Sequence, residues 1–240
     1  MGRKGKMIER QLNSSYLDET MTIKCYLPEV FTPLGNYHIC IMQDGDDYFR
    51  MGRVATVSDK LHDDGEIEPT VFVGIHYNDK YDRKEKYHPT GSKQKAYIDF
   101  LVREVVPLLD EEIPSDQVGA SRTLMGDSLA GTLALQTAIT YPQTFGKIIM
   151  QSPYVDNTVL EMVERADTSV SLSIYHTIGT DETVVEMSTG GEMDFLTPNR
   201  KLEQLLSHKP FNYSYYELDG PHTWKPWQTD LPRALTSMFG

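Results

Sequence analysis

The chain has 240 residues, a formal net charge of −12 and 39% hydrophobic residues, with fourteen Tyr, eight Phe and two Trp. Disordered chains lack the aromatic and branched residues that offset the entropy cost of ordering, so we expect one globular domain spanning residues 1–240. The negative charge repels a phosphate backbone and argues against nucleic acid as a partner.

The sequence also argues against a membrane as a partner. No apolar run reaches the roughly 18–20 residues that span a bilayer, and the N-terminal region lacks the apolar segment of a signal peptide. We therefore expect a cytoplasmic protein. Cys25 and Cys40 lie in apolar segments without His or Cys at metal-ligand spacing, which predicts buried free thiols. The oligomeric state stays open, a homodimer included.

The N-terminal third is predicted to form strands. Runs at 8–13 and 21–27 are joined by a segment too short for a helix, so they should pair antiparallel. The runs at 38–42 and 71–75 are almost continuously apolar, as is typical of strands buried on both faces of a sheet. The polar segment 76–87 that follows is predicted to be a loop.

From residue 94 onward, helical and strand patterns alternate. A long helix is expected at 94–111, with Pro107 as a kink or an early stop. The remaining strands are expected at 122–125, 147–151, 171–178 and 212–218, and the remaining helices at 128–140, 199–207 and 231–239. This alternation predicts the α/β class, with a mostly parallel central sheet of about eight strands and helices on both faces.

One motif points to a nucleophile. Residues 125–131 read Met-Gly-Asp-Ser-Leu-Ala-Gly, where a short strand meets a helix. Such an elbow strains the backbone of Ser128 and needs small neighbours, which Gly126 and Ala130 supply. Ala130 replaces the second Gly of the usual G-x-S-x-G pattern. The alternative is an ordinary serine at a helix N-cap.

A second motif is typical of an oxyanion hole. In the α/β-hydrolase fold, one donor is the backbone N–H after the nucleophile, here Leu129. The other comes from the loop after an early buried strand, where Gly45 lets the chain turn, and we assign it to the N–H of Asp46. The alternative is a calcium loop formed by Asp44, Asp46 and Asp47, but the full spacing of such a loop is absent, so no metal is expected.

The general base must be one of seven histidines. In this fold the triad follows the order serine, acid, histidine, and His222 alone follows the last predicted strand, in the loop Asp219-Gly220-Pro221-His222. The acid should come from the loop after the preceding strand, where Asp181 and Glu182 are adjacent. Neighbouring side chains point in different directions, so only one of the two can orient the imidazole.

The ordered set of motifs resembles the Putative esterase family of α/β-hydrolases, which includes enterochelin esterases, feruloyl esterases and esterase D. The similarity covers nearly the whole chain, from Tyr26-Leu27-Pro28 through Gln43-Asp44-Gly45 and the elbow to the segment 220–227. The resemblance implies a Ser-Asp/Glu-His mechanism without a cofactor. It also implies Glu182 as the acid, because the family places it fourth in a G-x-x-[DE] segment.

The residues and the resemblance together predict a serine esterase that acts through an acyl-enzyme on a small ester. The absence of an apolar lid-like insertion favours a soluble ester, siderophore-like or aromatic, over a lipid. Arg83, in the polar segment after the strand at 71–75, is the predicted substrate contact. The alternatives are an acyltransferase or thioesterase with the same triad, and a binding protein of the same fold without catalysis.

Overall fold

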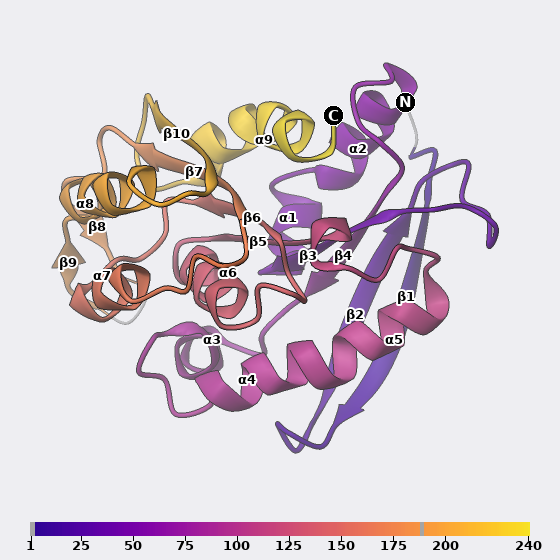
Figure 1. Ribbon diagram of the computed structural model, residues 1–240, viewed down its shortest axis with the longest axis horizontal. Helices are drawn as coiled ribbons and strands as arrows, with labels where there is room; N and C mark the ends of the chain where they lie inside the picture. Colours follow the sequence, from indigo (N-terminus) through magenta and orange to yellow (C-terminus); the bar gives the residue numbers. More distant parts are fainter. Residues whose placement is uncertain (1–2, 188–189) are drawn as a thin grey trace.

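The computed structural model describes residues 3–187 and 190–240, and an eight-stranded sheet runs through its centre (Figure 1). The strand order is β1-β2-β4-β3-β5-β6-β7-β10. Strands β1 and β2 pair antiparallel, β2 pairs antiparallel with β4, and the other neighbours are parallel. The strands are β1 (Lys6–Ser14), β2 (Glu19–Leu27), β3 (His38–Gln43), β4 (Thr70–Ile75), β5 (Arg122–Asp127), β6 (Lys147–Gln151), β7 (Ser173–Gly179) and β10 (Asn212–Leu218).

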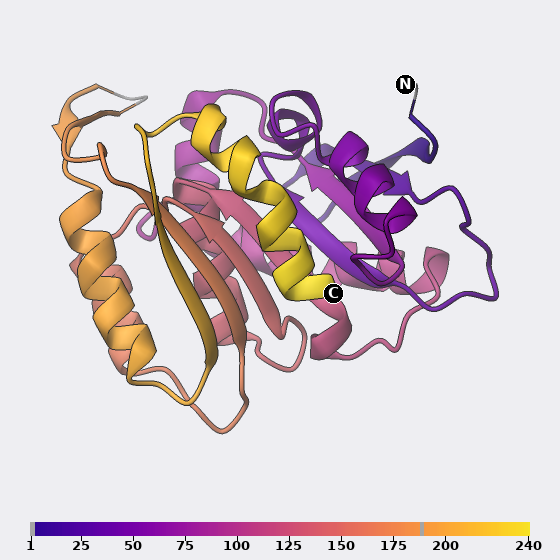
Figure 2. The same cartoon turned by 90° about the horizontal axis from the view of Figure 1, so that it is seen from above.

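Helices cover both faces of this sheet (Figures 1 and 2). One face carries α1 (Gly45–Arg50), α2 (Val54–Asp63) and α9 (Trp224–Phe239). The other face carries α3 (Lys80–Tyr87), α4 (Gln94–Phe100), α5 (Val106–Glu112), α6 (Leu129–Thr140), α7 (Asn157–Glu164) and α8 (Leu196–Ser207). A small hairpin of β8 (Val185–Glu186) and β9 (Glu192–Met193) lies apart from the main sheet. The predicted α/β-hydrolase architecture is confirmed.

The alternating side chains of the central strands create two hydrophobic cores. In β3, Ile39 and Ile41 pack toward α4 to α8, while Cys40 and Met42 pack toward α1, α2 and α9. Continuous burial on both faces explains why these strands read as unbroken apolar runs in the sequence. Cys40 and Cys25 are buried free thiols, as predicted.

The predicted helix at 94–111 continues to Glu112 through one wide turn. A π-helical turn (Leu101–Val105) joins α4 to α5, and the N–H of Val106 donates to the carbonyl of Leu101. Pro107 lies just after this turn. Its ring lacks an N–H and collides with the carbonyl four residues earlier in a regular helix, so the wider turn accommodates it. The helix therefore bends around Pro107 without stopping.

Two segments differ clearly from the predicted elements. Segment 76–87 contains helix α3, and its N-cap is Asp79, whose carboxylate accepts from the N–H groups of Tyr81 and Asp82. Helix α9 begins at Trp224 rather than at 231, and Pro232 lies within it. In both places the polar or proline-containing sequence resembles a loop, and packing against the sheet or a neighbouring helix decides the outcome.

Candidate active site

The backbone at Ser128 has the strained geometry of a nucleophile elbow. Ser128 lies between β5 and α6 with φ 52° and ψ −126°, a region that L-residues rarely occupy. Its N–H donates to the carbonyl of Gln151 on β6 at 2.9 Å. A Cβ at position 126 would lie 2.3 Å from the backbone of Ala130, so the close crossing of strand and helix requires Gly126. The Ala130 side chain is fully buried, so the elbow accommodates it.

Glu182 and His222 form a hydrogen-bonded pair. Their Oε2 and Nδ1 atoms are 2.6 Å apart, and Glu182 is fully buried at the end of β7. The other carboxylate oxygen, Oε1, accepts from the N–H of Gly179 at 2.9 Å and from the Oγ of Ser152 at 2.6 Å. Asp181 is exposed. Of the two acids that the residues left open, Glu182 is the one that contacts the imidazole.

Ser128 and His222 face the same cavity, which has a volume of 390 Å³. Ser128 is 9% exposed. Within residues 3–187 and 190–240, no hydrogen bond joins Ser128 Oγ to the imidazole, and such bonds often shorten only when a substrate binds. Apolar side chains make up part of the cavity lining: Leu129, Val185, Met187, Phe195, Trp224 and Trp227.

Of the two predicted oxyanion donors, Leu129 lines the cavity of Ser128, whereas Asp46 lines a separate cavity together with Lys24. Leu129 begins α6 and lines the cavity. Asp44 adopts the left-handed conformation (φ 58°) that turns the chain into α1, and a Cβ on Gly45 would lie 2.3 Å from the Cα of Gly74. The side chain of Asp46 points away and forms an ion pair with Lys24 at 2.6 Å. The backbone N–H of Asp46 precedes the first backbone hydrogen bonds of α1, in which the N–H groups of Asp47 and Tyr48 donate to the carbonyl of Asp44.

Charged side chains also line the cavity, and they are called the polar wall here: Asp44, Asp47, Asp127, Arg83 and Lys80. Arg83 on α3 contacts both oxygens of the buried Asp44, with its closest nitrogen at 2.6 Å. A second contact, at 3.4 Å, reaches the carbonyl of Asp127. Arg83 thus lies in the site as predicted, but it is also an anchor for the loop before α1, which the sequence did not reveal.

Asp127 is the most unusual member of the polar wall. It precedes the nucleophile and is 6% exposed, and its Oδ1 has no hydrogen-bond partner among the described residues. Burial, helped by the nearby Asp44, raises the pKa of Asp127 well above its ordinary value. Burial also raises the pKa of Asp47. The carboxyl groups of Asp127 and Asp47 are therefore harder to ionise than exposed ones.

A second polar cluster, around His176, does not line the cavity of Ser128. His176 is fully buried between Tyr213 and Asn199, with hydrogen bonds of 2.8 Å to each, and burial lowers its pKa to about 4. In the described residues, no group of three or more His, Cys, Asp or Glu side chains is arranged to hold a metal ion. No helix there has the length and apolar character needed to cross a bilayer.

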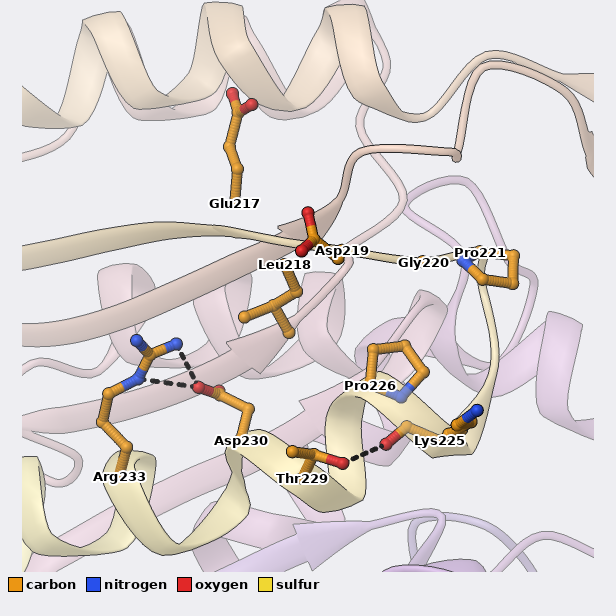
Figure 3. A pocket seen from close by; sticks show the side chains of 10 residues that line it. All are labelled: Glu217, Leu218, Asp219, Gly220, Pro221, Lys225, Pro226, Thr229, Asp230 and Arg233. Atoms are coloured by element: carbon orange, nitrogen blue, oxygen red, sulfur yellow. Dashed lines mark hydrogen bonds and ion pairs between the residues drawn. The ribbon is translucent and has the colours of Figure 1, made fainter.

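A wider cavity of 640 Å³ lies behind the loop that carries His222 (Figure 3). It is bounded by the end of β10, the segment 219–221 and the first turns of α9, where Asp230 and Arg233 form an ion pair. Neither Ser128 nor Glu182 nor His222 lines it. Ser128 and His222 line the smaller cavity instead.

Comparisons with known proteins agree with this fold. The model of the family described as Putative esterase matches residues 14–238. The uncharacterized protein YjcH of Bacillus subtilis is 46% identical over 237 residues, which cover 99% of each chain. The iron(III) salmochelin esterase of Escherichia coli is 29% identical over 135 residues, 55% of this chain and 31% of that protein.

Solved structures extend the similarity of the fold. A ferulic acid esterase superposes with a TM-score of 0.81 at 18% identity and covers 98% of both chains. The enterochelin esterase of Shigella flexneri has a TM-score of 0.81 at 17% identity, covering 97% of this chain and 57% of its own length. The match of the family model over nearly the whole sequence shows that this chain belongs to the Putative esterase family of α/β-hydrolases.

Proposed function

We propose that the protein is a serine carboxylic-ester hydrolase that works through an acyl-enzyme. The observation that carries this proposal is a strained serine and a carboxylate–imidazole pair on one cavity: Ser128 on its elbow, and His222 with its Nδ1 2.6 Å from buried Glu182. A nucleophile, a base and an orienting acid in this order are the parts that acyl transfer requires.

In the first half-reaction, Ser128 Oγ attacks the ester carbonyl while His222 Nε2 takes the hydroxyl proton. The N–H groups of Leu129 and Asp46 donate to the oxyanion. The tetrahedral intermediate then collapses, the C–O bond to the alcohol breaks, and His222 returns the proton to the leaving oxygen. In the second half-reaction, water attacks the acyl-enzyme with His222 again as base, which releases the carboxylic acid and restores Ser128.

The cavity favours a small ester that has an apolar ring and polar substituents. Its volume of 390 Å³ suits a small ligand. The aromatic side chains of Phe195, Trp224 and Trp227 and the polar wall both line it. Proteins of similar sequence or fold are named for ferulic acid, enterochelin and iron(III) salmochelin. We therefore propose an aromatic or siderophore-like ester, with Arg83 as a polar contact that acts from within its ion pair with Asp44.

The test is hydrolysis of a p-nitrophenyl ester series from acetate to decanoate by the wild type, Ser128→Ala and His222→Ala. We expect activity on the short chains, its loss in both variants, and labelling of Ser128 by a fluorophosphonate in the wild type alone. Activity that survives Ser128→Ala would overturn the assignment. Labelling of Ser128 without turnover of any simple ester would restrict the proposal to a specialised ester or another acyl acceptor.

A further inference from the structure

Ser152 is a second serine with positive φ, one strand away from the nucleophile. It follows β6 with φ 46° and is fully buried. Its N–H donates to the carbonyl of Thr177 on β7 at 2.7 Å. A non-glycine residue in this conformation costs about 1–3 kcal/mol and persists where the surroundings over-determine it, commonly at functional sites.

The hydroxyl of Ser152 links two residues of the catalytic end of the sheet. Its Oγ lies 2.6 Å from Glu182 Oε1 and 2.9 Å from the indole Nε1 of Trp227. An indole N–H can only donate, so the Ser152 oxygen accepts from Trp227 and its single proton goes to Glu182. Trp227 therefore donates to Ser152, and Ser152 donates to Oε1 of Glu182. The other carboxylate oxygen, Oε2, contacts His222 Nδ1.

Trp227 also contacts His222 directly. Its ring meets the His222 ring edge-on, with centroids 4.9 Å apart and an interplanar angle of 87°. Its backbone carbonyl accepts from the Nε2 of Gln151, the residue before Ser152, at 3.0 Å. The first turns of α9 are thus tied to the end of β6, and one tryptophan touches the imidazole directly and the carboxylate through Ser152.

We propose that Ser152 and Trp227 are positioning residues that hold the Glu182 carboxylate in line with His222 Nδ1. This inference rests on the proposed esterase function. Ser152 and the N–H of Gly179 fix Oε1, which leaves Oε2 aimed at the imidazole. The donor from Ser152 also draws negative charge away from the oxygen that faces His222, so it affects the basicity of the pair as well as its geometry.

The primary test is Ser152→Gly, because glycine adopts a φ of 46° without strain and only the hydroxyl is lost. Activity is expressed per active site, titrated with a fluorophosphonate, so that misfolded protein does not count. We expect kcat to fall about tenfold, the effect of losing a hydrogen bond to a charged group, with KM within about twofold. The acid limb of kcat/KM should move to higher pH, since more negative charge then faces the imidazole.

Two further variants separate positioning from folding. Trp227→Phe keeps a ring beside His222 and removes the indole N–H, so it should shift the acid limb in the same direction by a smaller amount. The matched control is Ser58→Ala, which removes another fully buried hydroxyl that contacts a histidine, His62, on α2 away from the site. It should lower stability and leave the acid limb in place.

An acid limb that Ser152→Gly leaves unmoved, with kcat per titrated site equal to wild type, would overturn the inference. Failure of the esterase function is a separate outcome, in which Ser128 of the wild type takes no label and no ester is cleaved. In that case the downfield proton resonance of His222 Nδ1–H is compared between wild type and Ser152→Gly, which needs no turnover. A changed resonance supports the positioning role, and an unchanged one rejects it.

Discussion

The serines that follow β5 and β6 both have positive φ but opposite surroundings. Ser128 and Ser152 both have positive φ, 52° and 46°, and their N–H groups donate to the next strand of the sheet. Ser128 Oγ faces a cavity and has no hydrogen-bond partner among the described residues, while Ser152 Oγ is buried with two partners. A positive φ therefore accompanies an open hydroxyl at Ser128 and a hydrogen-bonded hydroxyl at Ser152.

The difference shows what backbone strain achieves at each strand end. At Ser128 the cost of the conformation is not offset by contacts of the hydroxyl, which keeps the oxygen available to a substrate. At Ser152 two hydrogen bonds offset part of that cost and hold a carboxylate. Substitutions at the two serines and at the residues that contact them therefore test this difference directly.

The largest effect is expected at the acid that Ser152 anchors. Glu182→Gln should reduce kcat by about 10³–10⁴-fold on any ester that the wild type cleaves, because the amide cannot hold the imidazole in the required tautomer. Asp181→Asn is the matched control and should change kcat by less than about twofold, as expected of an exposed side chain away from the imidazole. A larger loss in Asp181→Asn than in Glu182→Gln would reverse the assignment.

The next effect concerns the ion pair that holds the Ser128 side of the site. Arg83→Gln leaves Asp44 buried without its cation and should lower the free energy of unfolding by about 3–5 kcal/mol in denaturant titrations. Arg200→Gln is the control, because it breaks a more exposed pair with Glu217 and should cost less than about 1 kcal/mol. Equal losses in both variants would show that Arg83 is no anchor.

Glycine substitutions should change the free energy of unfolding differently at the two serines. Ser128→Gly relieves strain without removing a hydrogen bond of the hydroxyl, so it should raise the free energy of unfolding by about 1 kcal/mol while abolishing activity. Ser152→Gly relieves similar strain but loses two buried hydrogen bonds, worth about 1 kcal/mol or more each, so it should not stabilise. Stabilisation of similar size at both positions would contradict the contrast drawn here.

The last expected effect depends on pH and concerns Asp127, beside the nucleophile. Burial raises the pKa of Asp127 in the folded protein, whereas the unfolded residue ionises above its ordinary pKa of about 4. The unfolded chain then binds fewer protons at this site, so stability falls as the pH rises above about 4. Asp127→Asn should add about 1–3 kcal/mol at pH 7, with a gain that shrinks toward pH 4.

Asp181→Asn again supplies an exposed control for the pH series. Its stability should differ from wild type by less than about 0.5 kcal/mol at either pH. A gain in Asp127→Asn that is constant across the pH range would mean that ionisation of Asp127 is not the cause.

Patterns in the sequence determined the buried strands and the candidate triad residues of this protein. Apolar runs predicted the strands buried on both faces, and a small-residue motif at a strand–helix junction predicted the elbow at Ser128. The order of the segments was enough to select His222, and the family resemblance was enough to place Glu182 beside it. The apolar runs and the elbow depend on residues close together in the chain, whose propensities and spacing act before any tertiary contact forms.

Only the tertiary structure decided how the site is held together. Ser152 and Glu182 are 30 positions apart in the sequence, Ser152 and Trp227 are 75 apart, and Arg83 is 39 from Asp44. No periodicity or short motif encodes such pairs, because they form where the ends of parallel strands converge. The same convergence buries Asp127 beside Asp44, so the charges and hydrogen bonds around Ser128 arise from strand packing rather than from local sequence.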